Sequence, residues 1–183
     1  MTLDGQGQVP GTVTALRRPP VRQSVLVRSD RRHTFDTFVH TIGIWWPVTP
    51  FSAGKDRVRD VTFERHPGGR VFETWQDGTE VDWGEVLVWE PPARFVMTWN
   101  MAAAVTEVEL TFTELGPALT RVAVEHRGWE QLTDEQLAED CALPGGYLGG
   151  AYRAGWARIL QCFTVALGGQ PLRPWRCTRW APT

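Results

Sequence analysis

The sequence has few cysteines and few histidines, and neither set is spaced for bonding. Cys141, Cys162 and Cys177 are odd in number, far apart and outside any Cys-x-x-Cys pair. This arrangement predicts neither a disulfide framework nor a zinc site. No two of the four histidines have metal-ligand spacing, and neither an HExxH motif nor a carboxylate triad occurs. We therefore expect no metal and no other cofactor.

Charge and hydropathy exclude two further classes of protein. The formal net charge is -2, so the chain has no basic footprint for nucleic acid and no polybasic membrane patch. No apolar run reaches the length of a membrane span. The first 20 residues are rich in Gly, Pro and Arg and lack the apolar core of a secretory signal. We expect a cytoplasmic protein with no nucleic-acid partner and no membrane span.

Motifs for covalent catalysis and phosphate binding are missing as well. There is no GxSxG sequence and no cysteine–histidine pattern that would indicate a nucleophile. The glycine-rich segment 145–150 lacks the lysine and the spacing of a phosphate-binding loop. Glu80, Asp82 and Glu85 share one predicted strand and could do acid–base work inside a cavity, but a solvated strand face is the favoured interpretation. The sequence thus leaves enzyme activity open, favours a protein that is not an enzyme, and identifies no catalytic residue.

What the chain has in excess is tryptophan, with ten residues among 183. Tryptophan is costly to leave in water and recurs in apolar pockets and interfaces. The length predicts one domain with a substantial core. We place that domain at residues 21–167, between a flexible N-terminal tail (1–20) and a C-terminal tail (168–183). Trp175 and Trp180 in the second tail suggest docking on the domain or on another subunit.

The segment Gly145–Leu167 has the period of a helix with one buried face. Apolar residues recur there at steps of three and four, which places on one side Leu148, Tyr152, Trp156, Ile159, Leu160, Phe163, Ala166 and Leu167. Gly168 and Gly169 would end this helix. Because its buried face is rich in aromatic rings, it needs a wide apolar partner surface.

That partner is a predicted antiparallel meander. Alternating segments separated by turn signals predict six successive strands: Val58–Arg65, Arg70–Gln76, Thr79–Trp89, Arg94–Asn100, Val105–Glu114 and Leu119–Arg127. Asp77-Gly78 is the strongest hairpin signal. A connector follows, with a short helix at Asp134–Asp140 that Thr133 and Gln136 cap reciprocally.

A strand and two helical pieces precede the meander. Val21–Arg28 alternates as a strand, and Ser29 or Asp30 can cap a helix at Arg31–His40. A short piece at Thr41–Trp46 ends at the prolines Pro47 and Pro50. The fold class is therefore α+β, with the order β-α-α-β6-α. Since sheets twist and coil, we expect the curved sheet to wrap around the C-terminal helix and to enclose a cavity.

Order and motifs together resemble a known superfamily. The motifs are Trp83-Gly84-Glu85-Val86-Leu87, Glu90-Pro91-Pro92-Ala93-Arg94, Thr98-Trp99, Thr120-Arg121-Val122 with His126-Arg127-Gly128-Trp129, and Gly155-Trp156. They resemble the START-like (SRPBCC) helix-grip superfamily, and within it the bacterial homologues of the activator of the 90-kDa heat-shock-protein ATPase.

The resemblance implies a helix-grip fold with an apolar cavity between the sheet and the long helix. Members bind lipids, hormones or polyketide-like molecules, and some relatives are cyclases or hydrolases. The link to the heat-shock chaperone implies a part in the stress response. The chaperone activators carry an additional N-terminal domain for which we expect no room in this chain.

The candidate ligand-binding residues would line that cavity with aromatic rings, with one polar group or with the space that a glycine leaves. They are Trp45, Trp46, Phe51, Trp99, His126, Gly149, Tyr152, Trp156 and Phe163. For any single ring the alternative is that it fills the core. Gly149 on the apolar side of the long helix and Gly155 at its edge could leave room for a ligand, or they could permit close packing or fraying of the helix. His126 shares the dry face with Val122 and Val124 and could act as a general base or bind a ligand, although such a histidine is more often a satisfied structural residue.

Three functions are compatible with the sequence. The first is binding of an apolar small molecule, lipid- or polyketide-like, in the cavity. The second is a cyclase or hydrolase that uses two convergent titratable groups, for instance His126 with Tyr152 or with a carboxylate. The third is a chaperone-type interaction module with an exposed tryptophan patch. An antiparallel edge strand and the tail tryptophans also favour a homodimer.

Overall fold

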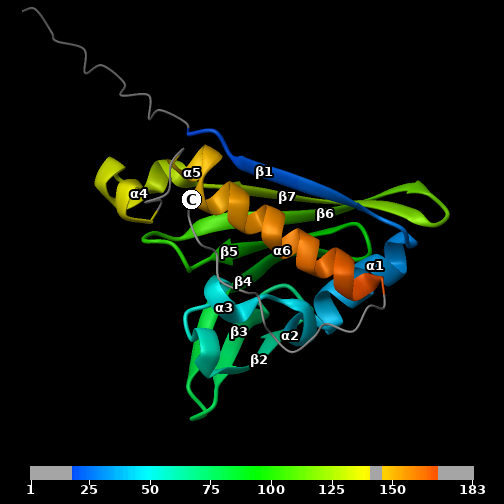
Figure 1. The fold of residues 1–183 in the computed structure, drawn as a ribbon, viewed down its shortest axis with the longest axis horizontal. Coiled ribbons are helices and arrows are strands. Elements are labelled where there is room, and N and C mark those ends of the chain that lie inside the picture. Colours follow the sequence, from blue (N-terminus) through cyan, green and yellow to red (C-terminus); the bar gives the residue numbers. More distant parts are fainter. Residues whose placement is uncertain (1–17, 141–145, 169–183) are drawn as a thin grey trace, which may run out of the picture.

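The structure, a computed structural model, describes residues 18–140 and 146–168 and contains one curled antiparallel sheet (Figure 1). The strands lie across the sheet in the order β1-β7-β6-β5-β4-β3-β2, and every neighbouring pair is antiparallel. Their bounds are β1 Val21–Val27, β2 Val58–Phe63, β3 Arg70–Trp75, β4 Glu80–Glu90, β5 Arg94–Trp99, β6 Thr106–Gly116 and β7 Leu119–Arg127. The predicted six-strand meander is therefore confirmed, with β1 added at the edge beside β7.

The helices pack against this sheet. The long helix α6 (Ala151–Leu167) crosses the concave face of the sheet. The helices α1 (Arg31–His40) and α2 (Ile42–Trp45) cover the other end of that face (Figure 1). The remaining elements are α3 (Val48–Phe51), the 3-10 turns η1 (Lys55–Arg57) and η2 (Trp129–Gln131), α4 (Asp134–Asp140) and α5 (Gly146–Gly149). The chain thus has the α+β helix-grip fold that the sequence predicts.

Strand register explains why one face of the sheet is dry. Val124 lies opposite Leu110, and Leu110 lies opposite Phe95, so three fully buried side chains form a row across β7, β6 and β5. Full burial of each such side chain contributes about 1.5–3 kcal/mol. On the opposite face Glu109 accepts hydrogen bonds from Arg94 and Arg127. The alternation in the sequence is therefore the alternation of core and solvent.

Three local signals of the sequence are confirmed. Asp30 caps α1 by accepting a hydrogen bond from the backbone N–H of His33 at 2.9 Å. Thr133 and Gln136 form the reciprocal capping box at α4. Gly78 adopts a φ of 88° in the β3–β4 turn, where a residue with a side chain would be strained.

The predicted long helix is wrong at its N-terminal end. Gly150 has φ -109° and ψ -115°, and the helix is therefore interrupted between α5 and α6. Leu148, which we placed on the buried face, is 39% exposed. Three glycines, Gly146, Gly149 and Gly150, weaken helix propensity there by about 1 kcal/mol each relative to alanine. Gly145, Gly169, Trp175 and Trp180 lie outside the described residues.

A second difference concerns the segment after α2. The sequence predicts that the helical piece Thr41–Trp46 ends at Pro47 and Pro50, whereas the structure has a further helical turn, α3, with non-helical dihedral angles at Thr49. This turn places Phe51 against α6, since a Cβ added to Gly155 would lie 3.2 Å from the Phe51 ring. Tertiary packing thus orders a segment whose local sequence signals disfavour a helix.

Candidate functional site

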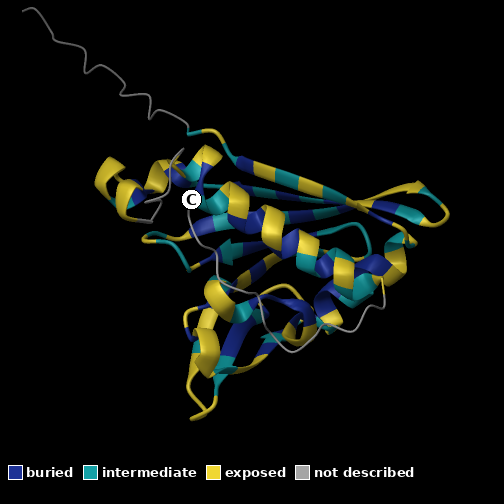
Figure 2. Ribbon diagram, in the orientation of Figure 1, coloured by how far each residue is buried: buried dark blue, intermediate teal, exposed yellow. Residues whose placement is uncertain are grey.

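Aromatic side chains fill the interior between the sheet and α6. The rings of Phe38, Trp45 and Phe163 lie within 5 Å of one another by their centroids, and the tilted rings of Trp46 and Trp83 have centroids 4.8 Å apart. The buried residues of α6 lie between Gly155 and Phe163, in the middle of the helix (Figure 2). The hollow that remains inside has a volume of about 20 Å³, room for roughly one water molecule. Trp45, Trp46 and Phe163 therefore pack in the core, and this hollow is too small for a larger ligand.

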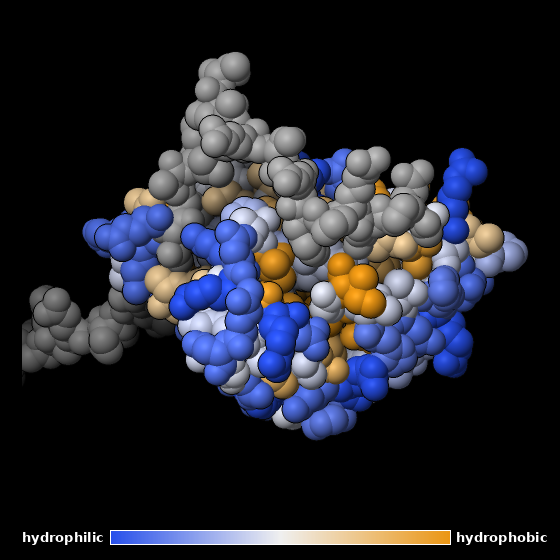
Figure 3. Space-filling model, turned by 60° about the horizontal axis from the view of Figure 1, so that its bottom comes forward, coloured by the Kyte–Doolittle hydropathy of each residue, from blue (hydrophilic) through white to orange (hydrophobic). Residues whose placement is uncertain are grey.

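The open space lies beside the core, in an apolar groove of about 410 Å³. Its walls come from α3, from the end of β5 and from the first half of α6. The lining residues are Pro50, Phe51, Ser52, Trp99, Met101, Ala151, Tyr152, Gly155, Trp156 and Ile159. On the face that comes forward in Figure 3, hydrophobic residues lie among hydrophilic ones. The volume is within the range of small-molecule sites, and four of the predicted residues meet here: Phe51, Trp99, Tyr152 and Trp156.

Two other hollows have similar volumes but a different chemistry. They measure about 500 and 400 Å³ and lie over charged residues of β1, β6 and β7. Arg127 in the first pairs with Glu107 and Glu125, and Arg22 donates to Glu125 at 2.7 Å. Because these charges already neutralise one another, the aromatic groove is the stronger candidate for a ligand site.

Gly155 creates part of the groove. It is buried in α6, and an added Cβ would lie 3.2 Å from Cε1 of Phe51. Gly149, the other glycine that we predicted to leave ligand space, is exposed in α5, and an added Cβ there would meet no atom within 4 Å. The break at Gly150 separates Gly149 from the face of α6. The small residue that the site uses is therefore further along the chain, within α6.

His126 lies directly beneath the groove and is bonded through both ring nitrogens. It is fully buried on β7. Trp156 Nε1–H donates to Nδ1 at 3.2 Å, and Nε2 lies 2.7 Å from the Thr106 hydroxyl. With Nδ1 accepting, Nε2 carries the proton and donates to Thr106, whose hydroxyl donates to the Trp99 carbonyl at 3.3 Å. The chain of bonds holds two groove walls, Trp156 and Trp99, and engages both nitrogens of the imidazole, which favours the structural interpretation of His126.

Burial also makes His126 hard to protonate. Desolvation lowers its pKa from 6.5 to about 3. Between these two values the unfolded chain binds a proton that the folded chain does not, so stability rises with pH across this window and falls on acidification. From pH 7 to pH 5 we expect this residue alone to lower the free energy of unfolding by about 2 kcal/mol.

Urea unfolding at pH 7 and pH 5 measures this effect. His126→Asn should be less stable at pH 7 but should lose the contribution of His126 to the pH dependence. His33→Gln, which removes an exposed histidine from α1, is the matched control. An unchanged pH dependence in His126→Asn would contradict the prediction.

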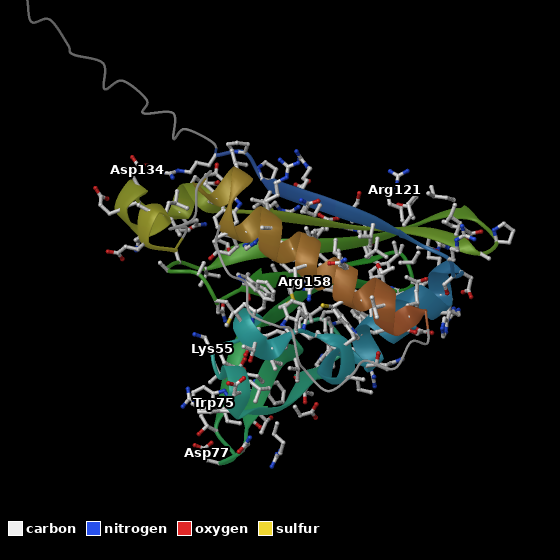
Figure 4. The ribbon with its side chains drawn as sticks, viewed as in Figure 1. Lys55, Trp75, Asp77, Arg121, Asp134 and Arg158 are labelled. Carbon is white, nitrogen blue, oxygen red and sulfur yellow. The ribbon has the colours of Figure 1, made fainter. Side chains whose placement is uncertain are left out.

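A second buried polar group, Glu73, holds the α3 side of the groove. Its carboxylate is fully buried and accepts four hydrogen bonds. Oε1 accepts from the Gly54 N–H at 2.5 Å and from Trp75 Nε1 at 2.6 Å, and Oε2 accepts from the Ala53 N–H at 3.2 Å and from Trp83 Nε1 at 2.8 Å. Trp75 and Lys55 lie at this end of the molecule (Figure 4). Glu73 thus fastens to the sheet the loop that directly follows Phe51 and Ser52.

Sequence reasoning missed Glu73, although a signal existed. Glu73 alternates with Val71 on the dry side of β3. An acidic residue at an apolar position indicates a buried carboxylate that needs donors. The acidic residues that we did single out, Glu80 and Asp82, instead pair with Arg70 on the surface, as the favoured interpretation predicts.

Metal and membrane sites are not seen in the part of the chain that the structure describes. Within residues 18–140 and 146–168, no group of three His, Cys, Asp or Glu side chains could hold a metal ion. In the same ranges no helix combines the length and the apolar character needed to cross a bilayer.

Comparison with solved structures places the fold among known proteins. CalC from Micromonospora echinospora, described as a self-sacrificing resistance protein, is 26% identical, with 85% of this chain and 97% of CalC covered and a TM-score of 0.57. DynU16, a protein of the dynemicin biosynthetic locus, is 17% identical over 84% of this chain and 49% of its own, with a TM-score of 0.57. The anthrahydroquino-γ-pyrone synthase Txn09 is 28% identical over 79% and 88% of the two chains, with a TM-score of 0.47.

The family follows from a different comparison. No curated protein matches the chain at a significant level. The model of the family described as Activator of Hsp90 ATPase homolog 1-like protein matches residues 44–168, which is more than half of the chain. This range contains the meander, the groove and α6. The chain therefore belongs to the family of Activator of Hsp90 ATPase homolog 1-like proteins.

Proposed function

We propose that the protein binds a flat, apolar small molecule in the groove between α3, the end of β5 and α6. The observation that carries the proposal is the groove itself: about 410 Å³ open, with walls of Phe51, Trp99, Tyr152 and Trp156 and with Gly155 in place of a larger side chain. Flat rings favour stacking and edge contacts with aromatic walls.

The enzyme alternative has less support. Among the described residues that line the groove, Tyr152 is the only titratable side chain. A cyclase or hydrolase needs a second group within hydrogen-bond reach of the reacting atoms. His126 lies beneath the wall with both nitrogens engaged, so it does not supply that group in this arrangement.

The interaction-module alternative predicts tryptophans on the surface. None of the eight tryptophans in the described ranges is exposed: six are buried, and Trp75 and Trp89 are half-buried. An exposed tryptophan patch therefore has no support from this part of the chain. A role with a chaperone partner would have to use other residues.

Native mass spectrometry of freshly purified protein tests the proposal. We expect an added mass of a few hundred daltons that disappears on collisional activation or denaturation. The same spectrum tests the predicted homodimer, for which β1 and β2 are the two edge strands. A mass equal to the bare chain, together with no binding of any flat apolar compound added afterwards, would argue against the proposal.

A further inference from the structure

Among the buried tryptophans, Trp99 differs from the others in its hydrogen bonding. Six tryptophans of the described residues are buried, and five of these indoles donate a hydrogen bond. The donors and acceptors are Trp45 to Phe38 O, Trp46 to Phe51 O, Trp83 to Glu73 Oε2, Trp129 to His126 O and Trp156 to His126 Nδ1. The Nε1–H of Trp99 is buried and has no partner among the described residues. A buried donor without an acceptor destabilises the fold by about 1–3 kcal/mol, and it is therefore rare.

The position of Trp99 suggests that this donor serves ligand binding. Trp99 is only 8% exposed, and it lines both the groove and the small hollow inside the core. Trp156 also lines both spaces, and its indole is held by His126. The backbone of Trp99 is also held, because its carbonyl accepts from Thr106. Trp99 is therefore anchored at the inner wall of the groove, and its Nε1–H makes no hydrogen bond to the described residues.

We infer that the ligand carries a hydrogen-bond acceptor, a carbonyl oxygen on a flat apolar ring system, which Trp99 Nε1–H binds. This inference rests on the proposed function and adds the polar group to it. Binding would give the indole the partner that the other five already have. Because the nitrogen is closed to solvent in the free protein, side chains at the groove floor move when the ligand binds. Met101, an unbranched and adaptable side chain of the lining, is suited to such a movement.

Two compounds of almost equal shape separate this inference from simple apolar binding. 9-Fluorenone and fluorene are both flat tricycles, and they differ in one carbonyl oxygen. We expect the wild-type protein to bind fluorenone roughly fivefold to tenfold more tightly than fluorene, since a net hydrogen bond changes affinity by about that factor. Trp99→Phe should bind the two compounds equally. Trp89→Phe, which changes a half-buried tryptophan outside the groove, should keep the preference.

A spectroscopic signature reports the bond directly. In ¹⁵N-labelled protein the Trp99 indole N–H resonance, identified by its absence from Trp99→Phe, should move downfield with fluorenone and much less with fluorene. If Trp99→Phe does not fold, the wild-type resonance, assigned through the Trp99 backbone, decides the question alone.

The outcomes distinguish the two proposals. Equal binding of both compounds in the groove, with the Trp99 resonance unmoved, would overturn the carbonyl inference and leave the proposed function standing. A preference for fluorenone that survives in Trp99→Phe would also overturn it. Binding of neither compound at the limit of solubility would overturn both the flat-ligand proposal and this inference.

Discussion

Gly155→Leu is expected to remove ligand binding at the groove while the fold remains intact. A Cβ at this position already lies 3.2 Å from the Phe51 ring, so the longer leucine side chain must occupy the groove. If it removes about 100 Å² of apolar contact from the ligand, affinity falls by about 2.5 kcal/mol, or roughly 70-fold. Calorimetric titration of wild type and variant with fluorenone measures this loss.

The variant should still fold, because leucine favours a helix over glycine by about 0.5–1 kcal/mol, which offsets the displacement of Phe51. Gly149→Leu is the matched control: an added Cβ at Gly149 meets no atom within 4 Å. It should bind fluorenone as wild type does. Equal affinity of Gly155→Leu and wild type, with both variants folded by circular dichroism, would show that the ligand does not bind in the groove.

Glu73→Ala is expected to lower the free energy of unfolding by about 4–5 kcal/mol. The change leaves four donors without their acceptor: the buried Gly54 N–H and Trp83 indole, and the partly buried Ala53 N–H and Trp75 indole. It also opens a cavity where a fully buried side chain lay. Urea unfolding monitored by tryptophan fluorescence gives the value.

Two further variants isolate the cause. Glu73→Gln keeps the size but directs an amide NH₂ toward N–H donors, so we expect an intermediate loss of about 2–3 kcal/mol. Glu80→Gln removes a carboxylate whose side chain is 46% exposed beside Arg70, and a loss below about 0.5 kcal/mol is expected. If Glu73→Ala unfolded at the same urea concentration as wild type, the four hydrogen bonds would not hold the loop after α3.

The glycines and the histidine of the candidate site show why sequence reasoning was incomplete. A helical wheel places Gly149 and Gly155 near the same apolar side only if the helix continues through Gly150, and it does not. Alternation along β7 correctly placed His126 on the dry face, but no periodicity can say that Trp156 and Thr106 engage its two nitrogens. The partners come from α6 and β6, 30 and 20 residues away in the chain.

The aromatic residues of the predicted site show that sequence patterns do not determine the volume of a cavity. The sequence patterns predicted that a helix, a loop and a strand bring large aromatic rings together, and the structure has this arrangement. Whether these rings leave a hollow depends on side-chain packing, which leaves about 20 Å³ in the hollow among the core rings and about 410 Å³ in the groove beside it. Phe51 and Trp99 line the open part, whereas Trp45 and Phe163 fill the closed part.

The sequence by itself determined the fold class, the order of the strands along the chain, the caps of α1 and α4 and the wet and dry faces of the sheet. These properties depend on periodicity and on contacts between near neighbours, which a linear pattern contains. Only the tertiary structure decided where the open space lies, which glycine creates it, how Glu73 and His126 are satisfied and that the Trp99 indole is left without a partner among the described residues. Each of these depends on atoms brought together from distant segments, and packing density and hydrogen-bond geometry are properties of that assembly alone.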